Sequence, residues 1–228
     1  MSDDVVISKK NAGYYAADLV KDGMIIGLGT GSTVFYAMER LSVRIKEEGL
    51  NIKGVPTSFQ TAMRARDYGI PLTTLDDYPK LDLAIDGADQ IDPNLCMIKG
   101  RGAAQTRERC VAQAAEKFVV VADEGKLCDV LSAVVPVELI PFSFGLVVER
   151  LKELSGNPKV REGVKKDGPV ITDNGCIEID CDFGEIKDAK ALQMEINNIP
   201  GVLSCGLFTE FGEKTVVVVG KTDGVKTL

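Results

Sequence analysis

The chain has 228 residues, a formal net charge of −7 and 45% hydrophobic residues, which is typical of a globular protein with one large domain or two small ones. The negative charge argues against a nucleic-acid-binding protein, because such proteins neutralise phosphates with basic residues. The sequence contains neither a run of about 18 apolar residues that would span a membrane nor the pattern of a signal peptide. We therefore expect a cytoplasmic protein that binds neither nucleic acid nor membranes.

Histidine is absent from the sequence, which removes the commonest metal ligand and the commonest general base. The six cysteines are scattered without a C-x-x-C pair, and we interpret them as reduced, mostly buried thiols. Any acid–base chemistry must therefore use carboxylates, lysines, cysteines or tyrosines.

The first part of the sequence alternates between short apolar runs and amphipathic segments. We expect helices at residues 6–21, 34–45, 57–68 and 103–117, and strands at 24–28, 52–56, 71–75, 81–85 and 118–122. This alternation predicts a Rossmann-like, mainly parallel sheet with helices on both faces.

The pattern changes after about residue 130. We expect a strand at 136–142, a helix at 143–155, extended segments at 158–164 and 176–181, a helix at 188–197 and a strand at 202–208. This order predicts a smaller, ferredoxin-like α+β domain. The valine-rich segment 215–219 suits a central position in the first sheet. The predicted domains are residues 1–130 with 206–228, carrying the candidate catalytic residues, and residues 131–205.

Three polar segments follow predicted strands, at the edge of an α/β sheet where ligands collect. They are GTGST (29–33), DGAD (86–89) and DEGK (123–126). The first predicts a phosphate site made of backbone N–H groups, a helix N-terminus and the hydroxyls of Ser32 and Thr33. The alternative is a tight turn with a helix cap. The segment lacks the lysine of a P-loop and the third glycine of a dinucleotide fingerprint.

Asp86 and Asp89 form a carboxylate pair at the end of a predicted strand, with no arginine expected nearby. A simple Asp-Gly turn is the alternative, but we favour a functional role. Lys99 and Lys126 also follow strand-like segments and are interpreted either as ligand-binding residues or as solvated surface lysines.

Glu108 shares the apolar face of its predicted helix with Ala104, Val111, Ala112 and Ala115. A carboxylate that faces a core is costly unless it is paired, and burial should raise its pKa toward the range of a general base. The alternative is a glutamate at the helix edge in an ion pair with a lysine. Together, these groups indicate proton abstraction next to the carbonyl of a sugar phosphate, most simply aldose–ketose isomerisation through an enediolate.

These segments resemble ribose-5-phosphate isomerases of the A type, nearly from end to end, and VKDGMIIGLGTGST is similar to archaeal members. The shared motifs are GLGTGST (27–33), DGAD (86–89), IKGRGAAQTRE (98–108), AEKFVVVAD (115–123), ITDNG (171–175), INNIPGV (196–202) and DGVKT (223–227). The resemblance implies interconversion of D-ribose 5-phosphate and D-ribulose 5-phosphate in the pentose phosphate pathway, without a metal or organic cofactor. It also implies a homodimer or homotetramer, with the small domain helping assembly.

The resemblance implies a role for each matching residue. Glu108 would carry the proton between C2 and C1, Asp86 and Asp89 would contact the sugar hydroxyls and assist ring opening, and Lys99 would stabilise the enediolate. Lys9 matches a phosphate-facing lysine. Further substrate contacts would come from Thr30, Gly31, Ser32, Thr33, Gly87, Ala88, Gly100, Arg101, Gly102 and Lys126.

Two positions depart from the family pattern. Arg101 stands where KGGG is common, and it either points away from the pocket or adds a positive charge to it. Gln90 replaces a frequent glutamate. Coenzyme A transferases and amino-sugar phosphate isomerases of the same fold remain alternatives, as does a sugar-phosphate-sensing binding domain.

Overall fold

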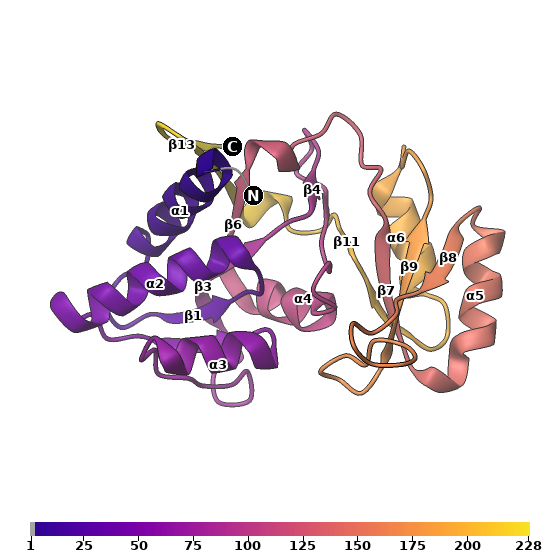
Figure 1. Ribbon diagram of the computed structural model, residues 1–228, viewed down its shortest axis with the longest axis horizontal. Coiled ribbons are helices and arrows are strands. Elements are labelled where there is room, and N and C mark those ends of the chain that lie inside the picture. The colour runs from indigo at the N-terminus through magenta and orange to yellow at the C-terminus, as the bar shows by residue number, and fades with distance from the viewer. Residues whose placement is uncertain (1–2) are drawn as a thin grey trace. The chain divides into compact units, whose positions relative to one another are not determined.

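The computed structural model describes residues 3–228 (Figure 1) and divides the chain into two compact units. Among the described residues, the first consists of 3–88, 107–126 and 213–228, and the second of 89–106 and 127–212. The predicted larger domain includes residues 89–106, 127–130 and 206–212, which this division groups with the second unit. None of the helices in residues 3–228 has the length and apolar character needed to cross a membrane.

The first unit is built on a six-stranded sheet with the order β13-β12-β6-β3-β1-β2. All neighbouring strands are parallel except β12 and β13, which pair in antiparallel fashion. The strands are β1 (Ile25–Leu28), β2 (Lys53–Pro56), β3 (Leu81–Gly87), β6 (Ala115–Asp123), β12 (Thr215–Lys221) and β13 (Gly224–Thr227). The mainly parallel sheet predicted from the alternating pattern is therefore confirmed, and the valine-rich β12 occupies an interior position.

Helices cover both faces of this sheet. Its helices are α1 (Asp3–Asp18), α2 (Ser32–Glu47), α3 (Phe59–Asp67) and α4 (Gln105–Ala114), the last beginning in the second unit. Ile26 and Leu28 of β1 pack in one core with α1, α2 and α3 (Figure 1). The residue between them, Gly27, faces the opposite side, because successive residues of a strand alternate. A Cβ atom there would lie 2.2 Å from Val111 Cγ1, so the glycine allows α4 to approach β1.

The strand order contains a switch point between β1 and β3. From β1 the chain crosses through α2 to β2 on one side, whereas β3, β6 and β12 follow on the other side. Ligands of open α/β sheets bind at such a point, beyond the carboxyl ends of the two strands. In this chain, GTGST (29–33) follows the end of β1, and Asp86 lies at the end of β3.

The second unit contains a four-stranded antiparallel sheet with the order β10-β7-β9-β8. Its elements are β7 (Val135–Leu139), α5 (Phe144–Glu153), β8 (Asn157–Val160), β9 (Ile177–Asp182), α6 (Ala189–Asn197) and β10 (Val202–Cys205). Their βαββαβ order confirms the predicted ferredoxin-like domain. A further small sheet joins β4 (Gln90–Ile91), β5 (Met97–Ile98) and β11 (Leu207–Phe208) in the order β11-β5-β4.

Several predicted boundaries were wrong. Residues 71–75 form no strand, and their pairing is an isolated bridge between Leu72 and Gly54. The expected strand 202–208 is broken at Gly206 into β10 and β11, which belong to different sheets. A Cβ atom on Gly206 would lie 2.3 Å from the carbonyl oxygen of Lys99, so this glycine permits a close approach of two backbone segments.

We expect Gly27→Ala to lower the free energy of unfolding by about 1–3 kcal/mol, because its methyl group would overlap Val111 and overpack the interface. Gly145→Ala is the matched control, since no atom outside the neighbouring helix backbone lies within 4 Å of a Cβ at that position in α5, and alanine is the better helix former. Thermal and urea unfolding measure both changes. Equal stability of the two variants would contradict the close packing at Gly27.

Candidate active site

Asp86 links the ends of β1 and β3. Its side chain is 2% exposed, and its Oδ1 accepts hydrogen bonds from the backbone N–H groups of Gly87 (2.8 Å) and Thr30 (3.2 Å). A Cβ atom on Gly29 would lie 2.0 Å from the same oxygen. Glycine at position 29 therefore makes room for the carboxylate, and the carboxylate in turn orders the GTGST segment.

The hydroxyl of Thr30 has a structural role. It lies within hydrogen-bond distance of the hydroxyl oxygens of Thr57 (2.9 Å), Ser58 (2.7 Å) and Thr61 (3.1 Å), and Thr61 also donates to the carbonyl of Gly29 (2.8 Å). These bonds attach GTGST to the beginning of α3. A substrate contact by the Thr30 hydroxyl stays a prediction.

The N-terminus of α2 supplies the features of an anion site. Helix α2 begins at Ser32, and its N-cap residue is Gly31, which makes no side-chain hydrogen bond to the helix end. The backbone N–H groups of the first turn can therefore bind an anion. Thr33 is buried, whereas Ser32 is half-buried. The Nζ of Lys9, from α1, lies 3.2 Å from the Ser32 hydroxyl. The family resemblance suggested Lys9 from a short match, and the structure places it beside this helix end.

Glu108 is buried, with 4% exposure, in the first turn of α4. Val111 and Ala112 of the same helix are also buried. The apolar helix face predicted from sequence is thus confirmed, and Glu108 lies on it rather than at an exposed helix edge. The role of Glu108 stays a prediction. The helix itself is shorter than predicted, because β6 already begins at Ala115.

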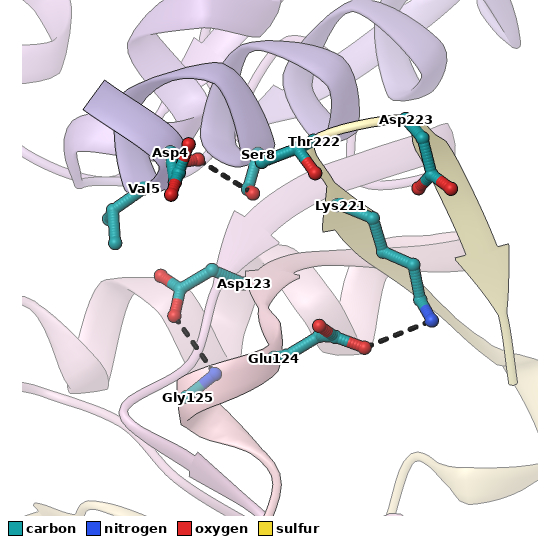
Figure 2. A pocket seen from close by; sticks show the side chains of 10 residues that line it. Asp4, Val5, Ser8, Asp123, Glu124, Gly125, Lys221, Thr222 and Asp223 are labelled. Carbon is teal, nitrogen blue, oxygen red and sulfur yellow. Dashed lines mark hydrogen bonds and ion pairs between the residues drawn. The ribbon is translucent and has the colours of Figure 1, made fainter. Parts of the chain in front are cut away.

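Lys126 ends the short helix η1 (Glu124–Lys126) after β6 and is half-buried. The neighbouring pocket of the first unit, shown in Figure 2, has a volume of about 450 Å³ and is lined by Asp4, Asp123, Glu124 and Asp223, among others. Lys221 is the one basic side chain among its ten described lining residues, and its Nζ lies 3.0 Å from Glu124 Oε1. This acidic lining does not suit a phosphate, and none of the predicted substrate-binding residues lines the pocket.

Asp89 belongs to the second unit and interacts with Arg101. Its Oδ2 accepts a hydrogen bond from the backbone N–H of Arg101 (3.0 Å), and its Oδ1 lies 3.8 Å from the Arg101 Nε. The expectation that no arginine lies near the carboxylate pair was therefore wrong. The Arg101 side chain is 77% exposed, so the ion pair is weak.

Lys99 follows β5 and is 2% exposed, although lysine is rarely buried. Its Nζ lies 5.3 Å from the centre of the Phe208 ring, within the range of a cation–π contact. The surface-exposed alternative for Lys99 is therefore wrong. Gly100 after it is buried, whereas Gly102 is exposed, and Gly87 and Ala88 at the end of β3 are half-buried.

Gln90 has a structural role in the second unit. Its Oε1 accepts hydrogen bonds from the backbone N–H groups of Ser132 (2.8 Å) and Ala133 (2.7 Å). Glutamine at this position, where the family often has glutamate, therefore holds the loop that contains Ser132 and Ala133. Among residues 3–228, the structure gathers no three His, Cys, Asp or Glu side chains that would hold a metal ion.

Comparisons with known proteins support the sequence resemblance. The sequence profile of Ribose 5-phosphate isomerase A (phosphoriboisomerase A) matches residues 53–224. The chain is 59% identical to ribose-5-phosphate isomerase A of Methanoregula boonei over 96% of this chain and 92% of that protein. The chain belongs to this family. The predicted family, enzyme class and similarity to archaeal members are confirmed. This decides against the coenzyme A transferase, amino-sugar phosphate isomerase and sensor alternatives.

Solved structures give the same result. Ribose 5-phosphate isomerase A of Methanocaldococcus jannaschii is 48% identical and superposes with a TM-score of 0.92, over 96% of this chain and 97% of the other. A D-ribose-5-phosphate isomerase solved in complex with phospho-erythronic acid is 43% identical and has a TM-score of 0.94, with 99% of both chains covered. The fold predicted from sequence is therefore that of this family.

We expect Lys9→Met to raise the Kd of inorganic phosphate about tenfold, because it removes a charged donor beside the first turn of α2. Lys10→Met is the matched control: it removes the same charge from the next residue, whose Nζ lies over the Tyr14 ring. Titration followed by ³¹P NMR gives both constants. Equal Kd values for the two variants would contradict a phosphate site at this helix end.

Proposed function

We propose that the chain interconverts D-ribose 5-phosphate and D-ribulose 5-phosphate by proton transfer through an enediolate, as an aldose–ketose isomerase of the pentose phosphate pathway. The observation that carries the mechanism is the burial of Glu108, a carboxylate with 4% exposure, in a chain without histidine. The reaction needs one group that removes the C2 proton and returns it to C1. A carboxylate held away from bulk water suits this task.

Separate groups serve the other parts of the substrate. We infer that the N-terminus of α2, with Ser32 and Lys9, binds the phosphate, because N–H groups and a lysine stabilise an anion. Asp86 and Asp89 would bind sugar hydroxyls and assist ring opening. Phospho-erythronic acid, bound by the 43% identical relative, is a phosphorylated sugar acid, and it supports a substrate of this class.

Lys99 supplies the positive charge for the proposed oxyanion. As the proton leaves C2, negative charge develops on the carbonyl oxygen, and a buried ammonium group stabilises it more strongly than an exposed one would. With 2% exposure, Lys99 has little access to water that would screen this charge. Glu108 is therefore the proposed base, and Lys99 is the proposed group that stabilises the oxyanion. With both roles filled by side chains, the proposed reaction requires no metal or organic cofactor.

We also propose a homodimer or homotetramer in the cytoplasm. The second unit carries Ile140, Phe142 and Phe144 with exposures of 41%, 99% and 38%. Neighbouring exposed apolar side chains of this size are typical of surfaces that bind another protein. This supports the predicted role of the small domain in assembly.

Glu108→Gln should lower kcat for ribose 5-phosphate by about 10²-fold or more, because the amide cannot accept the C2 proton. Glu116→Gln makes the same change at an exposed position of β6 and should leave kcat within about twofold of the wild type. The assay follows ribulose 5-phosphate formation, with circular dichroism as a check on folding. A folded Glu108→Gln protein with near-normal kcat would exclude Glu108 as the base.

Lys99→Met should lower kcat by about tenfold or more with a smaller change in KM, because the proposed charge interaction develops mainly in the transition state. Methionine keeps much of the side-chain volume beside Phe208. Steady-state kinetics separate the two constants. A raised KM with an unchanged kcat would instead indicate that Lys99 binds the ground-state substrate.

A further inference from the structure

The turn between Lys99 and α4 is held by side chains of the second unit. Arg161 Nη1 donates hydrogen bonds to the carbonyl oxygens of Gly100 (3.0 Å) and Arg101 (3.1 Å). Gln105 is fully buried, and a Cβ atom on Gly100 would lie 2.7 Å from its Oε1. Ala103 has φ 54°, which is uncommon for a residue with a side chain. The turn therefore depends on its surroundings to keep this conformation.

Two buried glutamates lie on neighbouring strands of the antiparallel sheet. Glu138 of β7 pairs directly with Glu178 of β9, and both are 0% exposed. The flanking residues Val137 and Ile179 pack into the hydrophobic core of this unit. Because side chains alternate along a strand, the two glutamates point to the opposite face of the sheet. Like charges at directly opposite positions are unfavourable, so two ionised carboxylates are not expected here.

Glu138 binds the first turn of α4 through Thr106. Its oxygens accept hydrogen bonds from the Thr106 hydroxyl, the Thr172 hydroxyl and Asn174 Nδ2, the last at 3.0 and 3.3 Å. Three donors suit a carboxylate, which accepts through both oxygens. Thr172 and Asn174 belong to the ITDNG motif (171–175), to which the proposed catalytic roles assign no function.

Glu178 binds the adjacent residue of the same helix. Gln105 Nε2 donates to Glu178 Oε1 at 2.5 Å, while Oε2 has no hydrogen-bond partner among the described residues. Burial raises the pKa of Glu178 to about 8, against the opposing effects of Arg161 and the Gln105 hydrogen bond. This pKa favours the protonated form of Glu178 at pH 7. The charged and titratable groups around it are Glu138 on β7, Asp180 on β9, Arg161 after β8 and Cys176 before β9.

We propose that Glu138 and Glu178 are positioning residues that fix the first turn of α4 and thereby the side chain of Glu108. This inference rests on the proposed role of Glu108 as the base. Gln105 and Thr106 are the first two residues of α4, and Glu108 follows two residues later in the same turn. Small displacements of a catalytic group lower the rate strongly, so the hydrogen bonds at the start of the helix act on kcat.

The first test compares two substitutions of Thr106. Thr106→Val removes the hydroxyl at nearly constant volume and should lower kcat about tenfold, with KM changed less than about threefold. Thr106→Ser keeps the hydroxyl and should retain a kcat within about twofold of the wild type. Wild-type kcat in Thr106→Val, or an equal loss in both variants, would overturn the proposal.

The second test uses the pH dependence of Glu178→Gln. At pH 7 the amide resembles the protonated acid, so kcat should lie within about threefold of the wild type. As the pH rises through about 8 the wild-type Glu178 ionises opposite Glu138, which should disturb the turn and lower kcat, whereas the amide stays neutral. The ratio of variant to wild-type kcat should therefore rise severalfold between pH 7 and pH 9.5. A constant ratio would overturn the proposal.

These experiments separate the inference from the function on which it rests. If the wild-type protein does not convert ribose 5-phosphate, the proposed function fails. If the wild type is active, Glu108→Gln is inactive and Thr106→Val is fully active, the function stands and the positioning role fails.

Discussion

The contact between Asp86 and the backbone at Gly29 and Thr30 connects the two strand ends at the switch point of the parallel sheet. It exists because β1 and β3 are neighbours in the sheet, although 52 residues (29–80) separate the end of β1 at Leu28 from the start of β3 at Leu81. The glycine at position 29 leaves room for the carboxylate, and the carboxylate accepts the N–H of Thr30. The segment that enters α2, with its uncapped N-terminus, is thereby fixed relative to an aspartate proposed to bind the sugar.

Burial of ionisable side chains is the second constraint on this molecule. Asp86, Lys99, Glu108, Glu138 and Glu178 are all nearly inaccessible to water. Such groups are costly to bury unless they are paired or neutralised, so each of them needs a partner or a role that accounts for its burial. The proposed roles divide them: the first three act on the substrate, whereas Glu138 and Glu178 hold the turn that precedes Glu108.

Periodicity and local motifs predicted the parallel sheet, the βαββαβ order and the buried side of Glu108, because these follow from spacing along the chain. They did not predict the break at Gly206, which arises from the backbone of Lys99, a residue distant in sequence. They also missed Gln105, Glu138, Arg161 and Glu178, whose interactions form only when β7 and β9 pair beside the turn. The available signals were two shared motifs: IKGRGAAQTRE (98–108) contains Gln105, and ITDNG (171–175) contains residues whose hydrogen bonds to Glu138 give that motif a structural reason.

The most direct test of the central claim, that a carboxylate carries the proton between C2 and C1 through an enediolate, is the isomerisation of ribose 5-phosphate in D₂O. The wild-type enzyme is kept at equilibrium for many turnovers, and deuterium at C1 of ribulose 5-phosphate and C2 of ribose 5-phosphate is measured by NMR. The account predicts that deuterium enters both positions, because a protonated carboxyl group exchanges with solvent in some turnovers. Complete interconversion without any deuterium incorporation would indicate direct hydride transfer and would contradict it.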